Sequence, residues 1–78
     1  MQVILSELIG HKIREERVKR GWGQKDLAER LYVDASDISR MEKGKNIENL
    51  EKLVLVANSL NIDVLELIAA GIENNTAR

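Results

Sequence analysis

Aliphatic side chains recur at spacings of three and four residues along most of this chain, and the chain contains no proline. Such spacing places apolar side chains on one face of an α-helix, and proline is the residue that most strongly interrupts a helix. Glycine, asparagine and aspartate separate the periodic stretches and favour helix ends and turns. The sequence therefore predicts an all-α fold of five short helices.

The 78-residue length is enough for one compact domain. We expect a single domain over residues 1–78, with its core over about residues 6–70 and a polar tail over residues 72–78. Helix boundaries follow from capping residues, with Asp34 and Asp63 as N-caps and Gly21 and Gly44 as helix ends. The five helices are expected over residues 6–20, 24–31, 35–43, 50–60 and 64–70, the fourth following either Asn46 or Asn49.

The core is expected to be aliphatic, because the chain has one tryptophan, one tyrosine and no phenylalanine. Trp22 has the spacing of a hydrophobic staple with Leu27 and is interpreted as a cover of the core. The residues that helical spacing places toward the core are Leu8, Ile9, Ile13, Val18, Leu27, Ala28, Leu31, Ile38, Met41, Leu50, Leu53, Val54, Ala57 and Leu60.

Missing residue types exclude several function classes. Without cysteine the chain forms no disulfide, no thiolate zinc site and no cysteine nucleophile. A lone histidine, His11, cannot build a histidine metal site, and the sequence has no glycine-rich phosphate loop. No apolar run approaches the roughly 18–20 residues that span a bilayer, and Val3-Ile4-Leu5 is too short for a signal peptide. We expect a cytoplasmic protein that is not an enzyme and has neither metal nor cofactor.

The net charge of −1 is unevenly distributed. Residues 1–22 carry a net charge of +2, residues 23–47 are balanced, and residues 48–78 carry −3. A uniform charge of this size would argue against a nucleic-acid partner. The observed polarity instead suggests that one end of the molecule approaches a polyanion while the acidic end has another role.

Residues 24–44 contain two predicted helices of about two turns each, joined by about three residues. A connection this short makes the helices cross steeply, as in a helix-turn-helix. From about Ile9 to Ile68 the sequence resembles the Cro/C1-type (Xre-like) helix-turn-helix family of phage repressors and small bacterial regulators. The resemblance implies a five-helix, lambda-repressor-like DNA-binding domain. Its matching elements, in order, are Ile13-Arg14, Arg17, Gly21, Gln24, Leu27-Ala28, Ile38-Ser39-Arg40-Met41-Glu42-Lys43-Gly44, Leu50-Glu51, Leu53, Ala57 and Leu60.

The resemblance also implies a set of DNA contacts. The helix after Asp34 would be the recognition helix in the major groove, and Arg40 would be its best reader, because a guanidinium donates two hydrogen bonds to guanine. Arg17 and Glu42 match a family ion pair that is structural rather than DNA-contacting. The implied base-reading residues are Ala35, Ser36, Asp37, Ser39 and Arg40. The implied contacts to the DNA backbone are Gln24, Lys25, Lys43, Lys45 and Asn46.

Three positions depart from the family pattern. Ala35 replaces a frequent polar or basic reader, and its methyl group would pack against DNA, for example on a thymine methyl. Asp37 has three interpretations, namely a first-turn acid that supports the helix dipole, a contact to cytosine N4, or a sign that DNA binding has been lost. Gly23 replaces the usual serine or threonine cap. These departures predict a weaker affinity for DNA.

Surplus apolar residues occur in the acidic C-terminal part. Residues 53–57 are five apolar residues in succession, more than one buried helix stripe needs. Such a surplus predicts a patch covered by a second copy of the chain, although a slightly larger monomer core would also account for it. The predicted dimer residues are Leu55, Val64, Leu65, Ile68 and Ile72.

The sequence thus predicts a sequence-specific, DNA-binding transcriptional regulator that acts as a homodimer on a palindromic operator. A Cro-like repressor, a restriction–modification controller and an antitoxin all fit, and a partner protein could supply regulation. The alternative is a protein-interaction module that has kept the helix-turn-helix fold without binding DNA. Asp37, Ala35 and the charge of −1 favour that alternative, whereas Gln24, Arg40 and the lysines that follow favour DNA.

Overall fold

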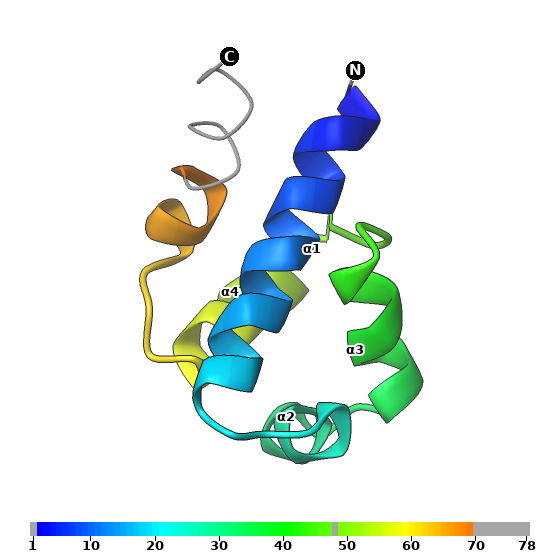
Figure 1. Ribbon diagram of the computed structural model, residues 1–78, viewed down its shortest axis with the longest axis vertical. Coiled ribbons are helices and arrows are strands. Elements are labelled where there is room, and N and C mark those ends of the chain that lie inside the picture. Colours follow the sequence, from blue (N-terminus) through cyan, green and yellow to red (C-terminus); the bar gives the residue numbers. More distant parts are fainter. Residues whose placement is uncertain (1, 48, 70–78) are drawn as a thin grey trace.

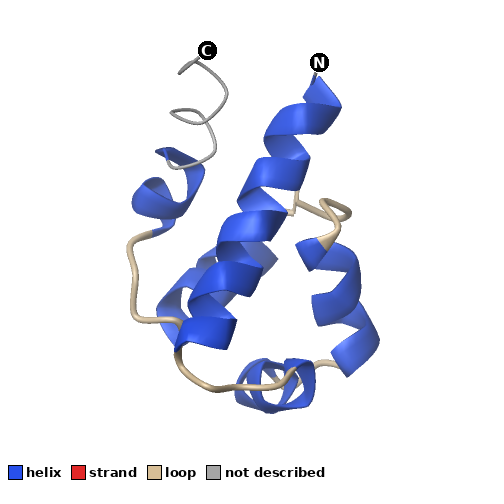
Figure 2. Ribbon diagram, viewed as in Figure 1, coloured by secondary structure: helices blue, strands red, loops and turns tan. Residues whose placement is uncertain are grey.

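The computed structural model describes residues 2–47 and 49–69, which form helices joined by short turns (Figures 1 and 2). The helices are α1 (Gln2–Lys19), α2 (Gln24–Leu31), α3 (Ala35–Glu42) and α4 (Leu50–Ser59), and residues 64–69 form a further helical segment. The described residues contain no strand. The predicted all-α fold with five helices is therefore confirmed.

The long helix α1 organises the molecule. It packs against α3. The helix α2 lies near the C-terminal end of α1 and contacts both α3 and α4 (Figure 1). Figure 1 shows α3 on one side of α1 and the segment 64–69 on the other. None of the helices in the described part of the chain is long and apolar enough to cross a membrane.

The first helix begins earlier than predicted, at Gln2 rather than near Ser6. The sequence between them contains no residue that breaks a helix, and Leu5 packs against the core from this added turn. Tertiary packing therefore extends the helix beyond the limit that capping residues suggested.

Most predicted core residues are buried, but two are exposed and three are half-buried. Val18 and Leu50 are exposed, because Val18 lies in the last turn of α1 and Leu50 is the first residue of α4. Leu8, Leu31 and Val54 are half-buried. The buried apolar residues are Ile9, Ile13, Leu27, Ala28, Ile38, Met41, Ile47, Leu53, Val56, Ala57, Leu60 and Leu67.

The register of α4 explains one of the differences. Its buried residues Leu53, Val56, Ala57 and Leu60 follow the 3.6-residue period, so Val56 rather than Val54 faces the core. Five successive apolar residues leave this choice open in the sequence, since either register gives an apolar stripe.

The predicted caps are only partly present. Asn49 Oδ1 accepts a hydrogen bond from the Lys52 N–H at 3.1 Å, and Asp63 Oδ1 accepts from the Leu65 N–H at 3.0 Å. Asp34 occupies the N-cap position of α3, but its side chain makes no capping bond. Gly21 and Gly44 have positive φ angles of 75° and 88°, as expected for helix ends.

Gly10 lies at the closest approach of α1 to α3. A Cβ atom on this residue would lie 2.6 Å from the carbonyl oxygens of both Met41 and Glu42. Only glycine allows the two backbones to come so close. This contact fixes the C-terminal end of α3 against α1.

Candidate nucleic-acid interface

A three-residue connection, Tyr32–Asp34, joins α2 to α3. Tyr32 adopts a left-handed conformation with φ 59° and ψ 43°, and the Val33 N–H donates to the Ala28 carbonyl at 3.0 Å. In Figure 1, α2 is seen nearly end-on while α3 runs in the plane of the view. The two helices thus cross steeply, as the short connection predicted.

The outer surface of α3 holds the residues that the sequence assigned to base reading. Ile38, Met41 and Glu42 are buried, so the opposite side of the helix faces outward. Ser36 and Arg40 are exposed there. The remaining three candidates, Ala35, Asp37 and Ser39, are half-buried, and Ala35 packs against the core.

Arg40 is held by an ion pair within its own helix. Arg40 Nη2 donates to Asp37 Oδ1 at 2.7 Å, and the same oxygen lies 4.0 Å from Nζ of Lys52 on α4. The hydrogen bond from Arg40, together with the nearby Lys52 charge, holds the pKa of the Asp37 carboxyl below its ordinary value. Asp37 therefore carries its negative charge next to two cations.

A buried network fixes the start of α2 to the end of α3. Arg17 makes two hydrogen bonds to the Glu42 carboxylate, from Nε to Oε2 at 2.6 Å and from Nη2 to Oε1 at 3.1 Å. Its Nη1 donates to the Trp22 carbonyl at 2.8 Å. Gln24 Nε2 donates to Glu42 Oε1 at 3.1 Å. The side chain of Glu42 thus joins α1, α2 and α3 at one point.

Residues 13–67, which include all of this network, match the helix-turn-helix family. The chain belongs to this Cro/C1-type helix-turn-helix family. The match confirms the resemblance on which the sequence-based assignment rested.

Two known proteins extend the comparison. The helix-turn-helix chain is 33% identical over 58 residues to the HTH-type transcriptional activator BcrR of Enterococcus faecalis, in a match that covers 74% of this chain and 28% of that protein. The chain thus spans little more than a quarter of that relative's length. The crystal structure of the clp gene regulator ClgR from C. glutamicum has the same fold, with a TM-score of 0.83, 24% identity, and coverage of 95% of this chain and 96% of that one.

The helix-turn-helix has exposed cations at the ends of its two helices. Lys25 follows Gln24 at the start of α2, while Lys43 and Lys45 follow α3. No acidic side chain among the described residues lies within 4.0 Å of these three ammonium groups. Asn46 is half-buried with a positive φ of 61°. The predicted backbone-contacting residues therefore lie on segments that the Gln24–Glu42 hydrogen bond brings together.

Three basic residues in and just after α1 surround one buried carboxylate. The buried Glu16 carboxylate lies 3.0 Å from Lys12 Nζ, 3.3 Å from Lys19 Nζ and 2.7 Å from Arg20 Nη1. Arg20 also donates to the Leu60 carbonyl, which ties α1 to the end of α4. One carboxylate balances only one of these three charges, so the cluster keeps a net positive charge.

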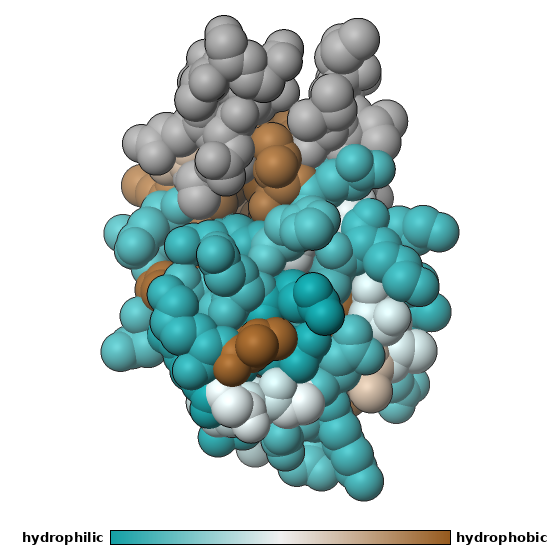
Figure 3. Space-filling view, viewed as in Figure 1, coloured by the Kyte–Doolittle hydropathy of each residue, from teal (hydrophilic) through white to brown (hydrophobic). Residues whose placement is uncertain are grey.

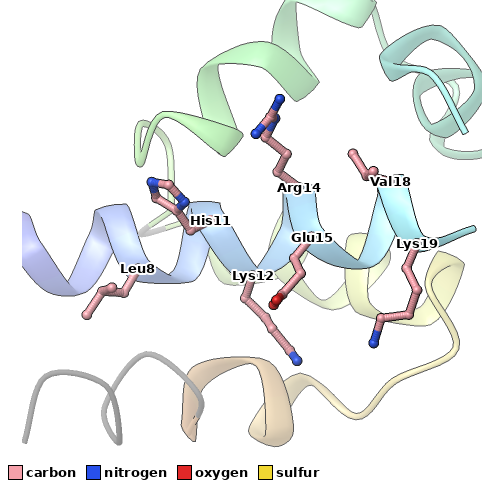
Figure 4. A pocket seen from close by; sticks show the side chains of 7 residues that line it. All are labelled: Leu8, His11, Lys12, Arg14, Glu15, Val18 and Lys19. Atoms are coloured by element: carbon pink, nitrogen blue, oxygen red, sulfur yellow. The ribbon is translucent and has the colours of Figure 1, made fainter. Parts of the chain in front are cut away.

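The outer face of α1 forms a shallow groove of mixed character. Figure 4 shows His11 and Arg14 on one side of the helix and Lys12, Glu15 and Lys19 on the other. The described part of the face seen in Figure 3 is largely hydrophilic. The ammonium groups of Lys12 and Lys19 in this groove pair with Glu16, while Arg14 joins none of the ion pairs among the described residues.

The Glu16 cluster predicts a specific dependence of stability on pH. Hydrogen bonds from Arg20, Lys12 and Lys19 lower the pKa of Glu16 from 4.5 to about 2. A lowered folded-state pKa gives stability that is present above pH 4.5 and lost as the pH falls toward 2. We expect Glu16→Gln to lower the free energy of unfolding by about 1–2 kcal/mol at pH 7 and to have little effect near pH 2.

Thermal denaturation followed by circular dichroism between pH 7 and pH 2 measures this difference. Glu15→Gln is the matched control, since Glu15 is an exposed neighbour that joins none of the ion pairs among the described residues. A Glu16→Gln deficit that stays constant down to pH 2 would contradict the assignment of the lowered pKa to these ion pairs.

Two residues of the interface were missed by the sequence analysis. Lys52 comes from α4 and reaches Asp37 only through the tertiary fold, so no local spacing could reveal it. Gly10, which lets α3 approach α1, had no signal in the sequence beyond a glycine within a helical pattern. By contrast, the Asp37–Arg40 pair has the i, i+3 spacing of helical ion pairs and could have been predicted.

Proposed function

We propose that this chain is a cytoplasmic, sequence-specific DNA-binding regulator of transcription, with α3 as its recognition helix. The observation that carries the proposal is the arrangement around Glu42. Its hydrogen bond to Gln24 brings the start of α2 to the end of α3, next to the exposed Lys25 and Lys43. Family membership supports the same function.

The arrangement suits DNA, in which charged phosphates lie beside base edges that side chains can contact. The first amides of α2 have no intrahelical acceptor, and the helix dipole places partial positive charge there, so this end binds a phosphate well. One amide N–H of Gln24 donates to Glu42, and the other remains available to donate to the same phosphate. Arg40 and Ser36 then face the base edges of the major groove, while Lys43 and Lys45 contact the backbone.

A dependence of binding on salt tests DNA binding itself. We expect the logarithm of the binding constant to fall with the logarithm of salt concentration with a slope steeper than about −3, because bound lysines release phosphate counterions. Lys43→Gln and Lys45→Gln should each reduce the slope by about 1. Fluorescence anisotropy with labelled duplex DNA measures these slopes.

Lys12→Gln is the matched control in the salt experiment, because it removes the same charge from a residue of α1 that is not among the proposed DNA contacts. Its slope should equal that of the unchanged protein. A flat salt dependence of the unchanged protein would refute DNA binding and leave a protein-interaction module as the better explanation.

We further propose that the regulator acts as a homodimer on a palindromic operator. Two of the predicted dimer residues are large and exposed, Leu65 at 70% and Leu55 at 44%. Val64 and Ile68 are half-buried and pack against the core of the same chain, and Ile72 lies outside the described residues. Leu55 lines the crevice beside Asp37 of α3, so the dimer is proposed on the exposed Leu65, and it would place two recognition helices about 34 Å apart.

Sedimentation of the unchanged protein and of Leu65→Glu tests the dimer. We expect the unchanged protein to sediment as a dimer at micromolar concentration and Leu65→Glu to sediment as an 8.8 kDa monomer, because a buried charge disfavours an apolar interface. Leu50→Glu is the control, since Leu50 is also exposed and is not one of the predicted dimer residues. A monomeric unchanged protein would refute the dimer.

A further inference from the structure

We infer that Asp37 is a specificity-determining residue that acts through Arg40, holding the guanidinium in the orientation that reads one base pair. Asp37 itself contacts no base in this arrangement. The inference rests on the proposed function, because it concerns how α3 reads DNA. It assigns to Asp37 a role different from each of the three that the sequence suggested.

The side chains of Asp37 and Arg40 differ in their exposure to solvent. The Asp37 side chain is 22% exposed, whereas the Arg40 side chain is 50% exposed. Asp37 Oδ1 accepts from Arg40 Nη2 at 2.7 Å and lies 4.0 Å from Lys52 Nζ on α4. The carboxylate is therefore held between α3 and α4, and the guanidinium is the group that remains available to a ligand.

Asp37 lies at the edge of an apolar crevice. The crevice's other lining is almost wholly apolar, apart from Lys52. The hydrogen bond from Arg40 is itself exposed, on the outer side of the carboxylate. A residue that read bases directly would need its carboxylate on the open surface of α3. The apolar residues of the crevice are Leu31, Val33, Met41, Leu55 and Val56.

The chemistry of the guanidinium makes such holding useful. Arginine has five N–H donors in a rigid planar fork, and the bond to Asp37 uses one of them. Two donors along another edge remain free for the O6 and N7 atoms of guanine. Holding a long side chain in one orientation before binding also reduces the entropy that binding must overcome. Asp37 at the same time has its own charge balanced, so that it repels DNA phosphates less.

The test compares Asp37→Asn, Arg40→Ala and the unchanged protein on an operator selected from a random DNA pool and on its single-base-pair variants. We expect Arg40→Ala to lose on the order of tenfold discrimination at one base pair. Asp37→Asn should lose a large part of that discrimination at the same base pair. Its affinity for non-specific DNA should not fall, since the substitution removes a negative charge.

Glu29→Gln is the matched control, because it removes the same charge from an exposed residue of α2 that joins no described ion pair. It should leave discrimination unchanged at every base pair. A second readout needs no DNA: nitrogen-15 NMR of the arginine side chains should show slow rotation of the Arg40 guanidinium in the unchanged protein and faster rotation in Asp37→Asn.

Three outcomes would overturn the inference. In the first, Asp37→Asn keeps full discrimination at the base pair where Arg40→Ala loses it. In the second, Asp37→Asn loses discrimination at a different base pair, which would mean that Asp37 reads a base directly. The third is free rotation of the Arg40 guanidinium in the unchanged protein. Failure of the unchanged protein to bind any DNA would instead refute the proposed function, with the NMR result still deciding whether Asp37 holds Arg40.

Discussion

Replacing Glu42 by alanine is expected to lower the free energy of unfolding by about 3–5 kcal/mol, because the change leaves Arg17 as a buried and unpaired cation. Glu42 is nearly inaccessible, with 4% of its side chain exposed, and it receives two hydrogen bonds from Arg17 and one from Gln24. A domain of this size has a total stability of about 4–12 kcal/mol, so the loss is a large fraction of the total. Urea denaturation followed by circular dichroism measures the loss.

A double variant separates the buried charge from other causes. Arg17→Met combined with Glu42→Leu removes both charges while keeping apolar volume, and such replacements of buried ion pairs are often neutral or stabilising. We expect it to recover most of the stability lost in Glu42→Ala. Its DNA affinity should remain low, because Gln24 has lost the acceptor that orients it. A double variant as unstable as Glu42→Ala would show that the unpaired charge is not the cause.

Gly10→Ala is expected to destabilise the domain by about 2–3 kcal/mol, although alanine normally stabilises a helix by about 1 kcal/mol relative to glycine. The added Cβ would lie 2.6 Å from the carbonyl oxygens of Met41 and Glu42, which are backbone atoms that cannot rotate away. The end of α3 must therefore move away from α1. Chemical denaturation measures the loss.

Gly23→Ala is the matched control for Gly10→Ala. A Cβ at Gly23 would lie 3.6 Å from the Asp26 carboxylate, an ordinary contact, and its φ of −81° suits any residue. We expect a loss below about 1 kcal/mol, because glycine is somewhat better than alanine at an N-cap. Equal losses in the two variants would mean that the close approach of α1 and α3 does not determine the effect at Gly10.

The parts of the fold that depend on local pattern were predicted well from the sequence. The helix α2 spans the predicted residues, and α3 begins after Asp34 as predicted. Errors occurred where local pattern is ambiguous. Val18 and Leu50 have the spacing of core residues, but they lie at helix ends where the chain leaves the core. The choice between Val54 and Val56 depended on packing against the rest of the molecule.

The candidate site was predicted by residue type more than by geometry. Resemblance to the family indicated Arg17, Glu42 and Gln24, and the structure brings these three side chains together. The sequence left three interpretations of Asp37 open, because nothing local revealed that Lys52 of α4 lies beside it. Formal charge likewise gave no sign that a single buried glutamate, Glu16, is surrounded by three of the five basic residues in residues 1–22.

The shared position of Glu42 limits how this protein can change over evolution. One carboxylate holds three helices together and also orients the glutamine next to the proposed phosphate site, so drift at Glu42, Arg17 or Gln24 alters folding and recognition together. Ser36, Arg40 and Lys43 take no part in that network and are exposed. If α3 reads DNA as proposed, substitutions at Ser36 and Arg40 would change the preferred DNA sequence while the scaffold stays constant.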